Sequence, residues 1–227
     1  MREIGNIKTK ISIQEITMFF KKKNIFRNLS IEEIKEKTRV LFIDDQNRND
    51  IIEYLSKSDW KCRQLFERDF DTLDAIDIKD SHIICVDING VGEKLGKNNG
   101  LDIVKSIKTK TPNKKIIIYS SQTTQNIFHE AVDLADKKIF KSAGDFEVFK
   151  NAIEELSKTI FSWDEMVLTS YEKVKPYYGD ELTLELYKTK LEKMSSKKSF
   201  SVEQLEVAFK ISTGIATLVF EGVKLFK

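Results

Sequence analysis

The feature that most restricts the fold is a regular alternation, between residues 38 and 160, of short apolar runs with amphipathic stretches. The runs are rich in strand-forming residues and lie at residues 39–43, 61–68, 82–86, 115–119 and 138–141. Strands that are apolar throughout belong to a parallel sheet that is covered by helices on both faces. We therefore predict an α/β domain with a five-stranded, doubly wound parallel sheet over residues 38–160.

The stretches between these runs have the spacing of helices that bury one face. Ile51, Ile52 and Leu55 recur at helical spacing after the first run. Further helices are expected around residues 72–76, from residue 100 to Pro112, around residues 127–134 and from about residue 146 to residue 160. A strand–helix alternation of this kind predicts parallel strands joined by helical crossovers.

Polar residues with complementary chemistry follow four of the five runs. The first run ends in Asp44 and Asp45, the third in Asp87, the fourth in Ser120 and the fifth in Lys141. In an open parallel sheet, ligands bind beyond the carboxyl ends of the strands. Carboxylates suit Mg²⁺, and a lysine and a serine suit phosphoryl oxygens. The set predicts Mg²⁺-assisted phosphoryl transfer onto a carboxylate.

This order of residues resembles the receiver domain of two-component response regulators, a flavodoxin-like family. The resemblance implies that Asp87 accepts the phosphoryl group. It also implies that Mg²⁺ is held by Asp44, Asp45, Asp87 and the backbone carbonyl of Asn89. The expected partner is a sensor histidine kinase or a phosphotransfer protein.

The same resemblance makes Ser120 the switch hydroxyl and Lys141 the lysine that pairs with the phosphate. The chain departs from the family after Asp87, where a glycine-rich loop, Gly90–Gly100, replaces the usual Met-Pro segment. Ser142 stands where a proline is usual, and Lys138 stands at the position of the usual aromatic switch residue. We therefore expect a phosphorylation signal to travel through residues 120–125 rather than through an aromatic rotation.

Two other functions remain open at this stage. One is a degenerate receiver fold that is never phosphorylated and serves as a scaffold or dimerisation unit. The other is a small-molecule or nucleotide sensor that uses the Gly90–Gly100 loop, although its glycines match neither the dinucleotide fingerprint nor the P-loop. His82 and His129 have no cysteine or second histidine at ligand spacing, so a zinc site is not expected. Catalytic turnover of a separate substrate is not expected either.

The flanks lie outside the receiver pattern. Residues 1–37 are expected to be helical or partly loose, and Ser30 with Glu33 forms a capping box. Residues 161–227 are expected to form a helical module of three helices, near 162–175, 180–194 and 202–226. The helix Val202–Phe226 is apolar on two sides. It is therefore expected to contact a second copy or a partner protein, or else to pack entirely within one subunit.

Composition limits the partners and the location. All six arginines lie at or before Arg68, so the C-terminal third lacks the residue that most often reads phosphates and guanines. We predict no nucleic-acid binding. Cys62 and Cys85 show no disulfide pattern, and no segment approaches the length of an apolar membrane span. A cytoplasmic protein is expected.

Overall fold

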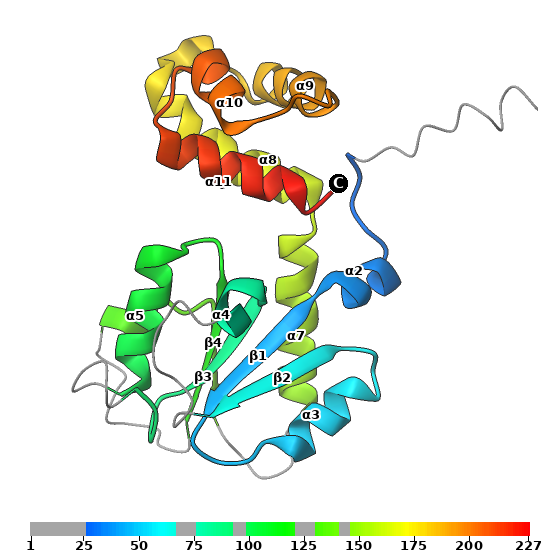
Figure 1. Ribbon diagram of the computed structural model, residues 1–227, viewed down its shortest axis with the longest axis vertical. Coiled ribbons are helices and arrows are strands. Elements are labelled where there is room, and N and C mark those ends of the chain that lie inside the picture. The colour runs from blue at the N-terminus through cyan, green and yellow to red at the C-terminus, as the bar shows by residue number, and fades with distance from the viewer. Residues whose placement is uncertain (1–25, 67–75, 93–98, 121–129, 141–145) are drawn as a thin grey trace, which may run out of the picture.

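The structure, a computed structural model, describes residues 26–66, 76–92, 99–120, 130–140 and 146–227. Its centre is a five-stranded parallel sheet (Figure 1). The strands are β1 (Arg39–Asp44), β2 (Lys61–Phe66), β3 (Ile83–Asp87), β4 (Lys115–Ser120) and β5 (Lys137–Phe140). They lie in the order β2-β1-β3-β4-β5, which is the flavodoxin-like order. The predicted α/β class and doubly wound sheet are confirmed.

Helices cover both faces of the sheet, as the apolar strands require. On one face lie α2 (Ile31–Lys37), α3 (Asn49–Ser56) and α7 (Phe146–Ile160), and on the other lie α4 (Ile76–Asp80), α5 (Gly100–Lys110) and α6 (Glu130–Asp133). Side chains of β1 alternate between the two layers: Phe42 packs on the α3 and α7 side, and Leu41 and Ile43 pack on the α5 side. Both layers are apolar, so every strand of this sheet except the edges is buried on two sides.

The element bounds differ little from the prediction where they can be compared. The helix expected around residues 72–76 overlaps α4, which spans Ile76–Asp80, only at Ile76, and residues 67–75 lie outside the described residues. Residues 127–129 of the helix expected before β5 also lie outside them. The capping box at Ser30 is confirmed: its side chain accepts from the backbone N–H of Glu33, whose carboxylate accepts from the N–H of Ser30.

The C-terminal region is a separate group of helices with its own core. It contains α8 (Trp163–Val174), two short 3₁₀ turns, η2 (Lys175–Tyr177) and η3 (Gly179–Glu181), then α9 (Leu184–Ser195), α10 (Val202–Phe209) and α11 (Thr213–Lys224). Trp163, Tyr187 and Phe209 are its largest buried side chains. The prediction of a helical module is right in kind, but the number of helices is wrong.

The prediction of a single helix over Val202–Phe226 is wrong, because α10 ends at Phe209 and α11 is a separate helix. Lys210 adopts a left-handed conformation with φ 46°, and α11 starts three residues later. The carbonyl of Ala208, near the end of α10, accepts hydrogen bonds from elsewhere in the fold. It accepts from the Tyr178 hydroxyl (2.9 Å) and from the Lys190 ammonium (2.5 Å). A helix end is stable when such partners exist, and sequence periodicity cannot show them.

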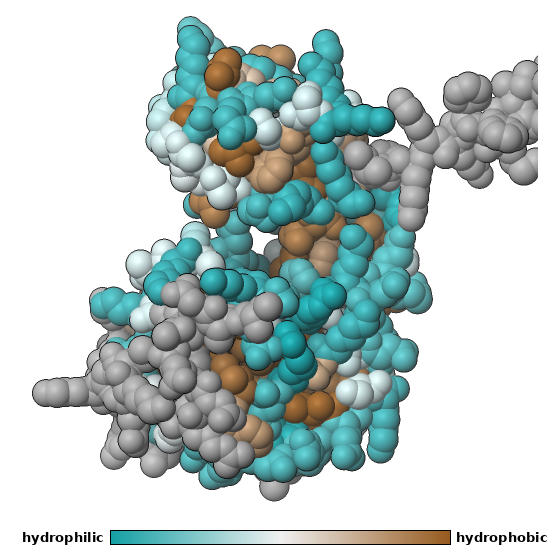
Figure 2. Space-filling model, in the orientation of Figure 1, coloured by the Kyte–Doolittle hydropathy of each residue, from teal (hydrophilic) through white to brown (hydrophobic). Residues whose placement is uncertain are grey.

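The two parts meet at a narrow junction where α7 leads into α8, and Figure 2 shows apolar side chains gathered there. Leu225 packs against both the core of the sheet domain and the C-terminal core, and its carbonyl accepts from Lys37 (3.1 Å). The Asn28 side chain accepts from the Trp163 backbone N–H (2.9 Å). Thus residues that precede the sheet help to hold the C-terminal helices in place.

Two further findings concern the cysteines and the described helices. Both cysteines are free thiols, and Cys85 is buried in the sheet as expected. Among the helices of the described residues, none has the length and apolar character needed to cross a membrane.

Candidate functional site

Three strand ends bring the predicted polar residues to one edge of the sheet. Asp44 is the last residue of β1, Asp87 of β3 and Ser120 of β4, and the parallel register places them side by side. Asp44 and Asp87 are buried, at 0% and 3% exposed, and Ser120 is 5% exposed. Asp45, the next residue after β1, is exposed. We call Asp44, Asp45 and Asp87 the acidic site.

The acidic site has the geometry of a metal-ion site. One carboxylate oxygen from each of the three residues lies within 4.8 Å of the others. Two oxygens that bind one Mg²⁺ at about 2.1 Å lie at most about 4.2 Å apart, so a small closure would bring them to bonding distance. All donors are hard oxygens, which Mg²⁺ prefers. The residues therefore fit the ion that the sequence predicts.

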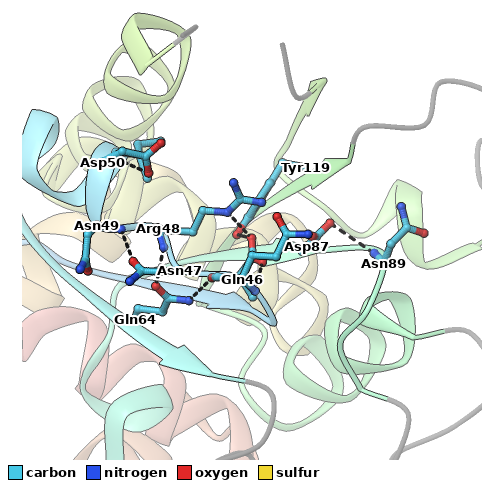
Figure 3. A network of polar contacts seen from close by, with 11 residues as sticks. Gln46, Asn47, Arg48, Asn49, Asp50, Gln64, Asp87, Asn89 and Tyr119 are labelled. Atoms are coloured by element: carbon cyan, nitrogen blue, oxygen red, sulfur yellow. Dashed lines mark hydrogen bonds and ion pairs between the residues drawn. The ribbon is translucent and has the colours of Figure 1, made fainter. Parts of the chain in front are cut away.

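Among the described residues, three donate hydrogen bonds to Asp44, and these donors, Gln46, Arg48 and Tyr119, are labelled in Figure 3. Its Oδ2 accepts from Arg48 Nε (2.6 Å) and from the Tyr119 hydroxyl (2.8 Å). Its Oδ1 accepts from the backbone N–H of Gln46 (2.8 Å). Sequence reasoning missed Arg48 and Tyr119. The alternation of the strands was a usable signal, because Tyr119 pairs with Asp87 and points to the face that Asp44 also occupies.

The charge states of these partners follow from their surroundings. Burial, and then the negative charge of Asp44, raises the pKa of Tyr119 well above its usual value, so the hydroxyl stays protonated and donates. Partial burial works to lower the pKa of Arg48. The hydrogen bond and charge of Asp44 outweigh it and leave the pKa of Arg48 raised. The result is an Arg–Asp ion pair whose carboxylate is shielded from water.

A second chain of contacts links Asp87 to the end of β4. The backbone N–H of Asn89 donates to Asp87 Oδ1 (3.3 Å), and the Asn89 side-chain amide donates to Ser120 Oγ (3.0 Å). Asn89 was predicted only as the donor of a backbone carbonyl to a metal. That role stays a prediction, and the structure adds a second one, because the Asn89 side chain reaches the predicted switch hydroxyl of Ser120.

The glycines of the loop after Asp87 have a packing role at both of its described ends. Gly90 has φ +75°, and a Cβ there would lie 2.6 Å from Asp45 Oδ2. A Cβ on Gly100 would lie 2.0 Å from the backbone oxygen of Asp87. Only glycine allows these approaches without displacing the acidic site. Val91 is fully buried between them, while residues 93–98 lie outside the described residues.

The cationic side of the site is described only in part. Lys141, the predicted phosphate-pairing lysine, and residues 121–125 lie outside the described residues. Lys138 is exposed and pairs with Asp133 (3.4 Å), and Phe140 is 58% exposed. Neither side chain at the end of β5 is therefore packed into the sheet core.

Comparisons with known proteins give structural matches alone. No protein-family model matches the chain, and no curated protein matches it. Response regulator protein TrrA of Thermotoga maritima, in complex with Mg²⁺-BeF, is 20% identical with a TM-score of 0.43, covering 52% of this chain and 98% of that chain. RcsB of Salmonella enterica serovar Typhimurium, bound to a promoter with phosphomimetic BeF₃⁻, is 20% identical with a TM-score of 0.44, covering 84% and 92%. TrrA in complex with histidine kinase ThkA is 20% identical with a TM-score of 0.42, covering 52% and 97%.

The strand order and the register by themselves fix the architecture. The chain has a flavodoxin-like α/β fold. What the site does must be argued from its own residues. Residues 161–227 add a helical module to this fold.

Proposed function

We propose that this protein is a phospho-acceptor switch in which Asp87 takes a phosphoryl group with the help of Mg²⁺. The single observation that carries the proposal is the position of Asp87. Its buried carboxylate belongs to the acidic site and is linked through Asn89 to the hydroxyl of Ser120. A metal site and a hydroxyl donor thus lie on either side of one carboxylate, as phosphoryl transfer requires.

The chemistry needs little from the protein beyond position and charge. A carboxylate oxygen of Asp87 attacks the phosphorus of a donor, and the P–N bond of a phosphohistidine or a P–O bond of a small acyl phosphate breaks. The leaving group takes the electron pair, and Asp87 becomes an acyl phosphate. Bound Mg²⁺ would neutralise charge on the phosphoryl oxygens. Ser120 supplies an O–H donor next to the new group, and Lys141 is proposed as its cationic partner.

The partner that supplies the phosphoryl group is proposed to be a sensor histidine kinase or a phosphotransfer protein, in the cytoplasm. We propose no turnover of a separate substrate, because the described site offers one nucleophile that is itself modified. The scaffold alternative keeps the fold without this chemistry, and it predicts that Asp87 stays unmodified.

The output is proposed to be a protein contact made by the C-terminal helices. Leu225 joins the two cores, so a shift in the receiver can reach α11 directly. Exposed apolar side chains on the module, Leu186 at 54% and Val207 at 80%, offer surface for a partner or a second copy.

One observation favours a second candidate, contact with DNA. The helices α10 and α11 are joined by three residues, which is the connection of a helix–turn–helix motif. In that motif the start of the second helix reads bases. Here the exposed residues at that position, Thr213, Gly214 and Thr217, are uncharged. The first cation of α11 is Lys224, which pairs with Glu221. Salt-sensitive binding of duplex DNA would favour the second candidate.

Intact-mass measurement after incubation with acetyl phosphate and Mg²⁺ tests the central proposal. The wild type should gain one phosphoryl group, and Asp87→Asn should gain none because it lacks the nucleophilic oxygen. Asp59→Asn is the matched control, since Asp59 is exposed and its left-handed backbone (φ 67°) suits asparagine. It should gain the same mass as the wild type, and removal of Mg²⁺ with a chelator should abolish the gain.

Two outcomes would contradict the proposal. An unmodified wild type, folded and in excess Mg²⁺, favours the scaffold alternative. An Asp87→Asn variant that gains the same mass places the modification on another residue.

A further inference from the structure

A cationic side chain, that of Arg48, lies directly against the acidic site. Arg48 Nε lies 2.6 Å from Asp44 Oδ2, and the Asp44 side chain is completely buried. The guanidinium also lies over the Tyr119 ring, 6.0 Å from its centroid. Of the three carboxylates that would hold a metal, one is therefore paired to an arginine within the fold.

Arg48 is held at its backbone as well as at its side chain (Figure 3). Its backbone N–H donates to Gln64 Oε1 (2.8 Å), and the Gln64 amide donates to the carbonyl of Gln46 (2.5 Å). Gln46 in turn donates its N–H to Asp44 Oδ1. A side chain on β2 thus fixes the loop between β1 and α3, and that loop aims the guanidinium at Asp44.

This arrangement opposes a divalent ion in two ways. Both oxygens of Asp44 already accept hydrogen bonds from protein donors, so Asp44 has little capacity left for a metal or its waters. A guanidinium at this edge of the sheet also repels a second cation, and the repulsion is strong because the site is partly shielded from water.

We propose that Arg48 is the resident counter-ion of the acidic site: it neutralises Asp44 when no metal is bound, and it sets the affinity for Mg²⁺. Coordination then falls mainly to Asp45, Asp87 and backbone oxygen. A phosphoryl group on Asp87 is negatively charged, so it would offset the charge of Arg48 and strengthen Mg²⁺ binding. This is a coupling between two binding events and is therefore reciprocal. The inference rests on the proposed function only in taking Mg²⁺ as the ion.

Calorimetric titration of the full chain with MgCl₂, at fixed ionic strength, tests this inference. Arg48→Gln should bind Mg²⁺ about tenfold more tightly than the wild type, since one like charge is removed from a partly buried site. Arg48→Lys, which keeps the charge, should stay within about threefold of the wild type. Arg63→Gln is the matched control, because it removes an exposed Arg–Asp pair of the same 2.6 Å length on β2, and it should leave the affinity unchanged.

Melting temperature supplies a readout that does not depend on phosphorylation. Without Mg²⁺, Arg48→Gln loses a cation that lies 2.6 Å from the buried Asp44 carboxylate, and it should melt below both the wild type and Arg63→Gln. Excess Mg²⁺ should close most of that gap. A variant that folds only in Mg²⁺ supports the inference equally, and one that fails to fold even in excess Mg²⁺ overturns it.

The inference and the proposed function can fail separately. Mg²⁺ affinity in Arg48→Gln that is equal to or weaker than in the wild type overturns the inference, even if the wild type is phosphorylated at Asp87. An affinity gain in Arg48→Lys equal to that in Arg48→Gln also overturns it, because charge would then not be the cause. A wild type that binds no Mg²⁺, beside an Arg48→Gln variant that does, supports the inference and counts against the proposed function.

Discussion

Removing the hydroxyl of Tyr119 isolates one of the hydrogen bonds that the described residues donate to Asp44. Tyr119 is 2% exposed, and its hydroxyl lies 2.8 Å from a carboxylate that is itself 0% exposed. In Tyr119→Phe the ring keeps its edge contacts with Phe42 and Phe149, at 6.2 and 5.4 Å between centroids. The change therefore removes a hydrogen bond and leaves no cavity larger than one oxygen.

The expected loss follows from the charge and burial of the acceptor. A hydrogen bond to a charged group contributes roughly 1.5–3 kcal/mol. Asp44 keeps Arg48 and the N–H of Gln46, so the loss in Tyr119→Phe should lie near the middle of this range, at about 2 kcal/mol. With a urea slope of about 1–3 kcal/mol/M, the unfolding midpoint should fall by about 1 M.

Urea unfolding at 25 °C, followed by circular dichroism, gives the comparison. Tyr54→Phe is the control, because the Tyr54 hydroxyl also donates to a carboxylate, that of Glu147, but at the exposed surface of the same domain. Its loss should be below about 1 kcal/mol, as for exposed ion pairs and hydrogen bonds to them. A loss in Tyr119→Phe of less than about 0.5 kcal/mol, or no larger than in Tyr54→Phe, would refute the claim that this network holds Asp44.

Two further predictions concern regions away from the acidic site. Burial, and then the charges of Lys114, Arg39 and Lys37, lowers the pKa of His82 from 6.5 to about 4. As the pH falls from about 6.5 to about 4, His82 therefore becomes protonated in the unfolded chain but stays neutral in the folded chain. About 1–2 kcal/mol of the free energy of unfolding should be lost over this range, after allowance for partial exposure. In His82→Gln the drop in unfolding free energy from pH 6.5 to pH 4.5 should be smaller than in the wild type, and an equal drop would contradict this. Leu225→Lys should make the junction between the two parts sensitive to limited proteolysis, because Leu225 packs on both cores. Val207→Lys, at an 80% exposed position, should leave the protease sensitivity of the junction unchanged. Equal sensitivity of the two variants would contradict the inference that Leu225 holds the two parts together.

The sequence predicted the sheet and the location of the site for a clear physical reason. Strands buried on both faces must be apolar along their whole length, so Val40–Ile43 and Ile83–Val86 are visible as runs. Parallel strands end at the same edge of a sheet, so Asp44, Asp87 and Ser120 could be placed close together from the sequence alone. The predicted roles of these residues in phosphoryl transfer remain predictions.

The electrostatic partners of the site were decided by tertiary contacts. Arg48 lies in the loop after β1, where nothing in its neighbours indicates whether the side chain turns inward. Its direction is set by Gln64, sixteen residues later on another strand. Asn89 likewise reaches Ser120 across thirty-one residues. Such bonds depend on which strands lie side by side, and hydrophobic periodicity carries no information about them.

The C-terminal helices show the same division. Periodicity correctly indicated helices that bury apolar faces, because that pattern is local. The break after Phe209 was not visible, since it depends on Tyr178 and Lys190, which satisfy the carbonyl of Ala208. The sequence by itself determined where chain segments are apolar and which polar groups follow them. Tertiary structure decided where helix ends find hydrogen-bond partners and which charges meet, because both require segments that are distant in sequence to be brought together.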